Sequence, residues 1–143
     1  FKGIPNFSPE IFRLVVNEDP LKTKQLNKGL AQLCEEGVAQ LFTRSDGNRK
    51  IVGTVGALQF DVIQYRLSHE YGAKCRFDEL RFIKACWVSS DHQSTLDEFI
   101  RLRPMNIAKD QDGRVIYLAD TQWSLDREIK ENPDVTFHMT SDI

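Results

Sequence analysis

The chain has 143 residues, of which 41% are hydrophobic, 28% charged and 10% aromatic. These proportions are typical of a folded domain that buries about two-thirds of its unfolded surface, and they exclude a disordered tail or a collagen-like chain. The net charge of −2, taken as an average over the chain, argues against a nucleic-acid-binding protein. The sequence has no secretory signal pattern and no run of about 18 apolar residues that could cross a membrane.

The start of the chain predicts a connector. Phe1 is not an initiator methionine, so we expect a piece of a longer protein or a processed product. Gly3, Pro5 and Pro9 fall within residues 1–9, and such residues are typical of a loop. We therefore interpret residues 1–9 as an interdomain connector.

Residues 10–88 predict an α+β unit of the ferredoxin-like order strand, helix, strand, strand, helix, strand. The strands are expected at 10–16, 38–43, 51–55 and 74–77, with more strand material at 81–88. The first helix follows Asp19 and Pro20, an N-cap and a first-turn residue, and stops at Gly37. The second begins near Phe60 and stops at Gly72, and the cluster Ser45-Asp46-Gly47-Asn48 predicts a hairpin turn between the two middle strands.

Residues 89–143 predict a smaller α+β extension that continues the pattern. We expect a helix capped by Ser90 or Asp91 that ends before Pro104, a turn at 110–113, a strand at 115–118, a helix at 121–132 and a strand at 135–139. The expected order of the extension is strand, helix, strand, helix, strand. No internal repeat is evident in the sequence.

Several kinds of catalytic site are absent from the sequence. There is no GxxxxGK[ST] loop, no GxGxxG and no GxSxG. Cys34, Cys75 and Cys86 have no CxxC spacing, and the three histidines, His69, His92 and His138, have no ligand spacing. We therefore expect a reducing, cytoplasmic environment, no metal site and no enzyme activity in this chain.

Two groups of basic residues are candidate contacts with a polyanion. The first group lies in the first half of the first predicted helix, where three ammonium charges add to the positive end of the helix dipole. The second group lies at the predicted hairpin tip, which is exposed in most proteins. A solvated surface with no partner is the alternative for both groups. The six residues are Lys22, Lys24, Lys28, Arg44, Arg49 and Lys50.

Charge is divided unevenly along the chain. Residues 1–88 contain 13 Lys and Arg against 10 Asp and Glu, whereas residues 89–143 contain 6 against 11. A basic first part can meet a phosphate backbone, and an acidic second part can face a protein.

Two segments resemble one known family closely. The first runs from Phe7-Ser8-Pro9-Glu10-Ile11-Phe12-Arg13 through Asp19-Pro20-Leu21-Lys22 to Glu35-Glu36-Gly37, and the second is Ile51-Val52-Gly53-Thr54-Val55-Gly56-Ala57-Leu58-Gln59-Phe60-Asp61-Val62. Both are similar to the C-terminal domain of the bacterial peptide chain release factor 3 family of translational GTPases. The likeness continues to Pro133-Asp134-Val135-Thr136-Phe137-His138, and 56–62 also resembles the third domain of elongation factor G.

The resemblance implies a domain of a translation termination factor that binds the ribosome. In that family, GTP-dependent action helps class I release factors to dissociate after peptide release. GTP and Mg²⁺ would bind in an N-terminal GTP-binding domain, which a β-barrel domain follows, and neither domain matches these residues. The implied partners are rRNA and small-subunit proteins, with class I release factors indirectly and no membrane.

Two other functions fit the same fold class. A ferredoxin-like domain can hold a regulatory small molecule between its helices and sheet. An RRM-type single-strand binder would need aromatic residues in the strand signature K/R-G-F/Y-G/A-F-V-x-F/Y, which the sequence lacks.

Overall fold

The computed structural model describes residues 9–44 and 49–138, and the predicted turn at 45–48 and most of the predicted connector lie outside them. The elements are, in chain order, β1 (Ile11–Asn17), the 3₁₀ turn η1 (Pro20–Lys22), α1 (Thr23–Glu35), β2 (Gln40–Arg44), β3 (Lys50–Thr54), α2 (Leu58–Tyr71), β4 (Cys75–Glu79), β5 (Lys84–Ser89), α3 (Gln93–Arg101), β6 (Ile107–Lys109), β7 (Val115–Ala119), α4 (Gln122–Glu131) and β8 (Thr136–His138). The α+β class predicted from the sequence is confirmed.

The strand order contains a repeat that the sequence does not reveal. The eight strands of the described chain form one antiparallel sheet in the order β4-β1-β3-β2-β6-β7-β5-β8. The first four strands have the ferredoxin-like order, and the last four have the same order reversed. The second part is thus a complete second unit, β5-α3-β6-β7-α4-β8, with one strand (β6) more than predicted.

Strand β5 belongs to this second unit. The sequence pattern at 81–88 ends the predicted first unit, but β5 pairs with β7 on one side and β8 on the other. By strand pairing, the change of unit therefore falls between β4 and β5, before the predicted boundary at 88/89. The two units are joined where the end of β2 pairs with β6, through Thr43 with Lys109 and Arg44 with Ala108.

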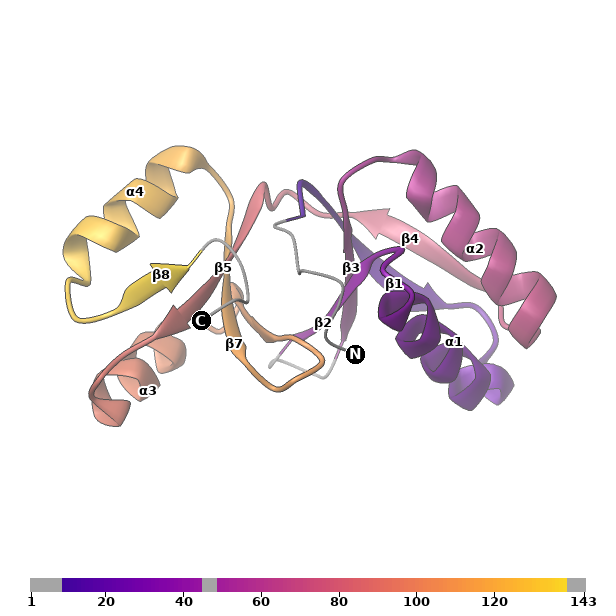
Figure 1. Ribbon diagram of the computed structural model, residues 1–143, viewed down its shortest axis with the longest axis horizontal. Helices are drawn as coiled ribbons and strands as arrows, with labels where there is room; N and C mark the ends of the chain where they lie inside the picture. Colours follow the sequence, from indigo (N-terminus) through magenta and orange to yellow (C-terminus); the bar gives the residue numbers. More distant parts are fainter. Residues whose placement is uncertain (1–8, 45–48, 139–143) are drawn as a thin grey trace.

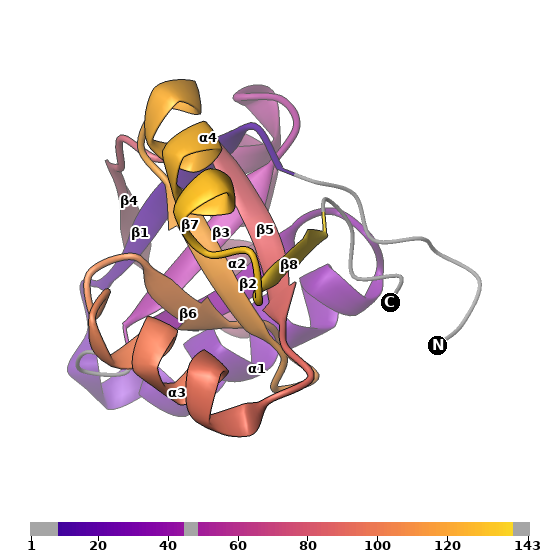
Figure 2. The same ribbon diagram turned by 90° about the vertical axis from the view of Figure 1, so that its left-hand side faces the viewer.

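The molecule has four layers, with helices outside and strands inside (Figure 1). α1 and α2 cover one half of the sheet, and α3 and α4 cover the other half (Figure 2). Alternate residues of each strand point to opposite faces. One set packs under the helices of its own unit, and the other set packs in a central core between the two halves.

Aromatic side chains form the middle of the central core. Phe42 lies between Phe12 and Trp87, with ring centroids 6.3 and 6.4 Å apart, and all three are at most 1% exposed. The indole Nε1–H of Trp87 donates to Oδ2 of Asp110, 2.8 Å away. Oδ1 of the same carboxylate accepts from the backbone N–H groups of Asp112 and Arg114, so Asp110 ties the predicted turn at 110–113 to the core.

Most of the predicted helix boundaries are confirmed. Asp19 caps η1 by accepting from Leu21 N at 3.1 Å, and Gly37 and Gly72 have φ of 84° and 65° just after α1 and α2. Such left-handed residues end helices, and glycine adopts them without strain. The predicted cap of α3 is wrong, because its N-cap is His92 and Ser90 Oγ instead accepts from His92 N and donates to the Asp134 carbonyl.

Two features hold α1 against α2. Gly29 lies where the helices touch, and a Cβ there would come within 2.6 Å of Leu67 Cδ2 and 2.9 Å of Tyr71 Cδ2. Arg66 of α2 donates to Glu36 at the end of α1 (2.7 Å) and to Glu70 on its own helix (2.8 Å). The Arg66 hydrogen bonds lower the pKa of both carboxyl groups below the usual 4.5, with the Coulombic attraction of Arg66 adding to them.

Replacing Gly29 with alanine should destabilise the chain, although alanine favours helix by about 1 kcal/mol. The added Cβ meets the buried Leu67 and the ring of Tyr71, so the helices must separate, at a cost of about 1–3 kcal/mol. Urea unfolding measures the change. Gly56→Ala is the control, because a Cβ there meets nothing within 4 Å, and it should change stability by less than about 0.5 kcal/mol. Equal effects of the two substitutions would contradict the close approach.

Acid should remove the stabilisation that Arg66 provides. The carboxyl groups of Glu36 and Glu70 have a lower pKa in the folded chain than in the unfolded chain, so the unfolded chain binds more protons as the pH falls. Their contribution to the free energy of unfolding is therefore present above pH 4.5 and is lost as the pH falls through the lowered pKa values. Arg66→Met should therefore unfold at less urea than the natural chain at pH 7. Below pH 4.5 the two unfolding midpoints should converge.

Removal of the two carboxylates that Arg66 bonds, instead of Arg66 itself, provides the control. Glu36→Gln combined with Glu70→Gln should remove the same acid dependence while Arg66 remains, because the titrating groups are gone. If the urea midpoints of the natural chain and Arg66→Met still differ by the full amount at the lowest pH, the guanidinium acts by packing rather than by charge.

Candidate functional site

Three of the predicted contact residues form an exposed basic surface at the start of α1. Lys22 is half-buried at the end of η1, and Lys24 and Lys28 are exposed one turn apart on the solvent side of α1. None of the three makes an ion pair with another described residue. The three ammonium groups are thus available to an anionic partner.

The start of this helix is well ordered and positively charged. Thr23 Oγ1 donates to the Pro20 carbonyl (2.8 Å) and accepts from Asn17 Nδ2 (3.0 Å), which ties the turn to the end of β1. No acidic residue lies in the first turn of α1. The positive end of the helix dipole is therefore reinforced by the lysines and not neutralised within α1.

The second predicted group is only partly brought to the same place. β1 and β2 run in the same direction with β3 antiparallel between them, so the end of β1, the end of β2 and the start of β3 lie at one end of the sheet. Arg49 is exposed there, and Lys50 is half-buried with its Nζ 3.2 Å from Thr43 Oγ1. Arg49, Lys50 and the start of η1 thus share this end of the first unit.

Arg44 is not part of this surface. It is 8% exposed, and its guanidinium NH2 lies 3.4 Å from the Met105 carbonyl oxygen, across the join between the two units. The sequence suggested an exposed hairpin tip, but β2 pairs with β6 up to Arg44, which covers the side chain. Arg44 is a structural residue at the join, so it is withdrawn from the candidate contacts.

Thiol, metal and membrane sites find no support among residues 9–44 and 49–138. Burial raises the pKa of the Cys34 thiol to about 12 and those of Cys75 and Cys86 to about 11, which disfavours the reactive thiolate. No group of three or more His, Cys, Asp or Glu is placed to hold a metal ion in this part of the chain. Nor is any helix in it long and apolar enough to cross a membrane.

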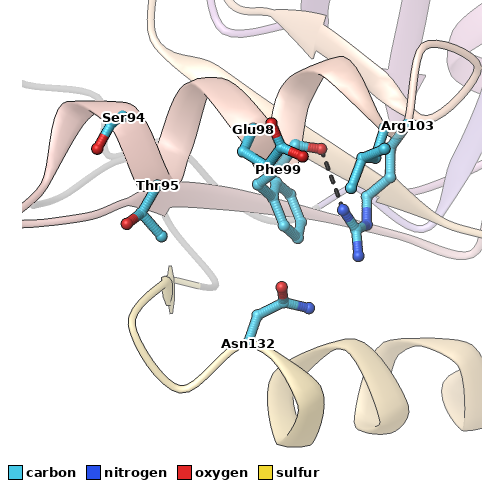
Figure 3. Close-up of a pocket in the computed structure, with 7 residues that line it drawn as sticks. Ser94, Thr95, Glu98, Phe99, Arg103 and Asn132 are labelled. Atoms are coloured by element: carbon cyan, nitrogen blue, oxygen red, sulfur yellow. Dashed lines mark hydrogen bonds between the residues drawn. The ribbon is translucent and has the colours of Figure 1, made fainter.

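Two adjoining cavities of about 330 and 350 Å³ lie in the second unit, on the helix-covered face. Phe99 and Arg103 line the first from the α3 side and Asn132 from the end of α4 (Figure 3). Tyr117 and Ser124 line the second. Tyr117 of β7 and residues of α4 both line the second cavity, so it lies between helix and sheet. The alternative of a bound small molecule between helices and sheet stays a prediction.

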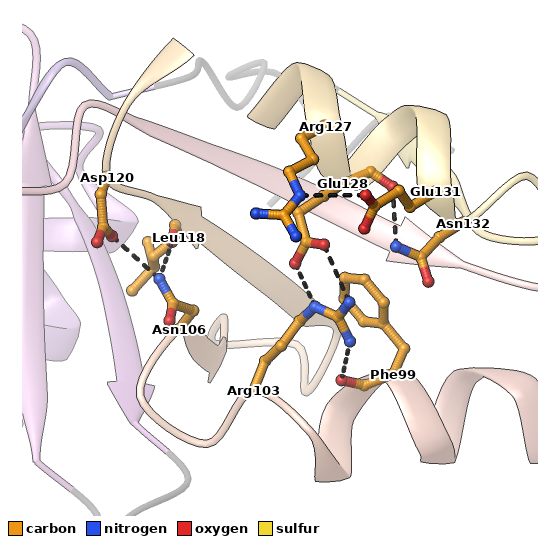
Figure 4. Close-up of polar contacts among 9 residues, drawn as sticks. All are labelled: Phe99, Arg103, Asn106, Leu118, Asp120, Arg127, Glu128, Glu131 and Asn132. Carbon is orange, nitrogen blue, oxygen red and sulfur yellow. Dashed lines mark hydrogen bonds and ion pairs between the residues drawn. The ribbon is translucent and has the colours of Figure 1, made fainter. Parts of the chain in front are cut away.

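Arg103 lines both cavities, and all three of its guanidinium nitrogens donate hydrogen bonds. Its guanidinium donates to both carboxylate oxygens of Glu128 on α4 and to the Phe99 carbonyl, and lies 4.1 Å from the centre of the Phe99 ring (Figure 4). The hydrogen bonds to Glu128 raise the pKa of Arg103 further. Arg103 thus joins α3 to α4 and is not available as a free cation for a ligand.

Sequence reasoning missed one exposed feature, an apolar stripe on α2. Leu58, Val62 and Tyr65 are 78%, 49% and 62% exposed, although the same helix already buries Phe60 and Ile63. The signal was the spacing i, i+4, i+7, which repeats the helical period on the opposite side.

The family comparison agrees with the sequence and the fold. The family model for the C-terminal domain of class II release factor RF3 matches residues 1–128, which is nearly the whole chain. The matched range contains the first unit, with the lysines of α1, and the second unit as far as residue 128 within α4. The chain therefore belongs to the class II release factor RF3 C-terminal domain family.

Proposed function

We propose that this chain binds the small ribosomal subunit through rRNA phosphates that contact Lys22, Lys24, Lys28, Arg49 and Lys50. In the whole factor it helps class I release factors to dissociate after peptide release. The family match supports a translation termination domain. The single observation that carries the rRNA contact is the group of three lysines at the start of α1, exposed or half-buried, with no carboxylate in the first helical turn.

Physical considerations favour phosphate as the ligand of these lysines. Lysine charges and free backbone N–H groups at a helix start both attract phosphate oxygens. The placement of three lysines where the dipole is already positive costs helix stability, by a few tenths of a kcal/mol each. A role outside the helix therefore explains them better than helix stability does.

We also propose that GTP hydrolysis belongs to another part of the whole factor. The sequence has no GxxxxGK[ST] loop to hold a triphosphate. GTP and Mg²⁺ would bind to a preceding domain. The role of the present chain is then to contact the ribosome and to be repositioned when that domain changes its nucleotide, in the cytoplasm.

The sheet face that an RRM-type single-strand binder would use is buried in this domain. An RRM stacks bases on aromatic residues of an open sheet face. Here the corresponding face of the first unit carries Phe12 and Phe42, and both are buried against the second unit. Single-stranded RNA cannot reach them while the two units are packed together.

Replacing Lys22, Lys24 and Lys28 together with alanine should weaken binding to purified small ribosomal subunits. If each exposed contact is worth about 0.5–1 kcal/mol, the affinity should fall by about ten- to a hundredfold at low salt. The slope of log affinity against log salt should also become shallower, by roughly 0.7–0.9 for each lost phosphate contact. Cosedimentation of the full chain with subunits over a salt series measures both.

A control of equal charge tests whether position matters. Lys84, Arg101 and Lys130 lie in the second unit, and their replacement with alanine changes the net charge by the same amount. This variant should bind nearly as well as the natural chain. If both triple variants lose affinity equally, net charge alone is responsible and the proposed surface is wrong.

A further inference from the structure

α2 is apolar on two opposite sides. Its buried stripe (Phe60, Ile63 and Leu67) packs in the core under the helices. Leu58, Val62 and Tyr65 lie about half a turn away, because successive residues are about 100° apart, and they face solvent. The α2 stripe, as we call these three residues, continues the 50% exposed Val55 just before the helix. Contiguous exposed apolar side chains mark interaction surfaces more often than isolated ones do.

The α2 stripe is not needed to hold the helix in place. Gln59 Nε2 donates to the Val38 carbonyl (3.0 Å), and its Oε1 accepts from the backbone N–H groups of Val55 and Gly56. Gln64 Nε2 donates to the Cys75 carbonyl of β4 (2.8 Å), on the neighbouring side. Together with the Arg66 ion pairs, these bonds fix α2 on its flanks and leave the outward side chains unused.

One part of the stripe is already ordered. The Tyr65 ring stacks on the His69 ring one turn later, with centroids 3.9 Å apart and an angle of 22° between the planes. His69 Nδ1 lies 2.9 Å from the Tyr65 carbonyl oxygen, which fixes the imidazole. Less side-chain entropy is then lost when a partner covers Tyr65, and aromatic residues of this kind are common anchors of protein interfaces.

The charges beside the stripe indicate what covers it. α1 and α2 are antiparallel, since Gly29 faces Leu67 and Tyr71 while Glu36 reaches Arg66. The first half of α2 therefore lies beside the last turn of α1, where Glu36 is located. Asp61 is exposed on the other flank and pairs with no cation among the described residues.

This border is negative, because the Arg66 guanidinium is shared between Glu36 and Glu70. The Arg13 guanidinium lies 4.5 Å from the centre of the Phe60 ring, on the buried side of α2, and pairs with Glu79. The lysines of α1 lie toward the opposite end, beside the second half of α2. A phosphate backbone is repelled by the acidic border, and a second copy of the chain would bring the same negative border. A protein segment with Lys or Arg beside its apolar residues complements both features.

We propose that the α2 stripe is a docking surface for an amphipathic protein helix whose apolar residues cover Leu58, Val62 and Tyr65 and whose flanking lysines or arginines meet Asp61 and Glu36. This contact is separate from the proposed rRNA contact, which uses the lysines of α1. The two surfaces lie on neighbouring helices, so one protein partner and one RNA can be held together.

The probe is a fluorescein-labelled helical peptide of about 15 residues with leucine at every third or fourth position and lysine on its flanks. Fluorescence anisotropy with the full chain should detect binding. Val62→Gln and Tyr65→Gln, both at exposed positions, should each weaken it by at least about tenfold, the loss expected for a central interface residue. Asp61→Asn should weaken it less and reduce its salt dependence.

Two matched controls separate this surface from the rest of the chain. Trp123→Gln removes an equally exposed apolar side chain (69%) from α4 and should leave peptide binding unchanged. The triple alanine variant at Lys22, Lys24 and Lys28 should lose ribosomal subunits but keep the peptide. Failure of one contact is therefore distinguishable from failure of the other.

Four results would overturn the proposal. Three are failures of peptide binding: the lysine-flanked peptide does not bind, a glutamate-flanked peptide with the same leucines binds equally well, or Val62→Gln binds the peptide as well as the natural chain does. The fourth is displacement of the peptide by single-stranded oligouridine. If Tyr65→Gln abolishes that displacement, the stripe is an RNA surface. Sedimentation equilibrium tests the remaining occupant, since a dimer that Val62→Gln dissociates would assign the stripe to a second copy.

Discussion

The packing of the two half-sheets against each other determines which surfaces of this domain can have a function. Phe12 and Phe42 from the first unit meet Trp87 from the second, and all three are excluded from water. Burial of one such aromatic side chain stabilises the fold by about 2–3 kcal/mol. The free energy needed to separate the halves is therefore far larger than the free energy of a typical surface contact. Asp110 adds a hydrogen bond to the indole and thereby ties a surface turn to the same core. The open sheet face that many ferredoxin-like domains offer to ligands is consequently lost, and the helix-covered faces and the ends of the sheet remain.

The elements that could be predicted are those with a local signal. Asp19 and Pro20 mark the start of the first helical segment, and Gly37 and Gly72 mark helix ends through their left-handed backbone, a property of single residues. β6 could not be found in this way, since three residues are too few to show a period and its pairing partners β2 and β7 come from both units. The second unit stayed hidden for the same reason: its first strand, β5, follows β4 closely in sequence but pairs only with later strands.

Arg44 illustrates the corresponding difficulty for the site. The sequence shows that a side chain is charged and which residues precede and follow it. Whether the side chain is buried depends on which segments, distant in the sequence, pack against it. β6 lies along β2 at Arg44, and Met105 supplies a carbonyl oxygen that accepts from the guanidinium. Lys24 and Lys28 were easier to place, because the apolar residues of α1 identify its buried side and thus its solvent side. The α2 stripe was hidden because apolar residues on both sides of a helix weaken the periodic signal that distinguishes its faces.

The two helix pairs show how one topology produces different surfaces. In the first unit Gly29 lets α1 and α2 touch, and the Arg66 ion pairs lock them, so their outer sides form one continuous surface. In the second unit α3 and α4 are joined through Arg103 and Glu128, and Arg103 also lines two cavities. The position of Glu36 at the negative end of α1, unfavourable for the helix dipole, is explained by its bond to Arg66. No such internal partner explains the lysines at the other end of α1 within the described residues. The net charge of −2 is therefore a poor guide to partners, because it averages over three lysines at one helix start whose cost to that helix is not offset by an ion pair among the described residues.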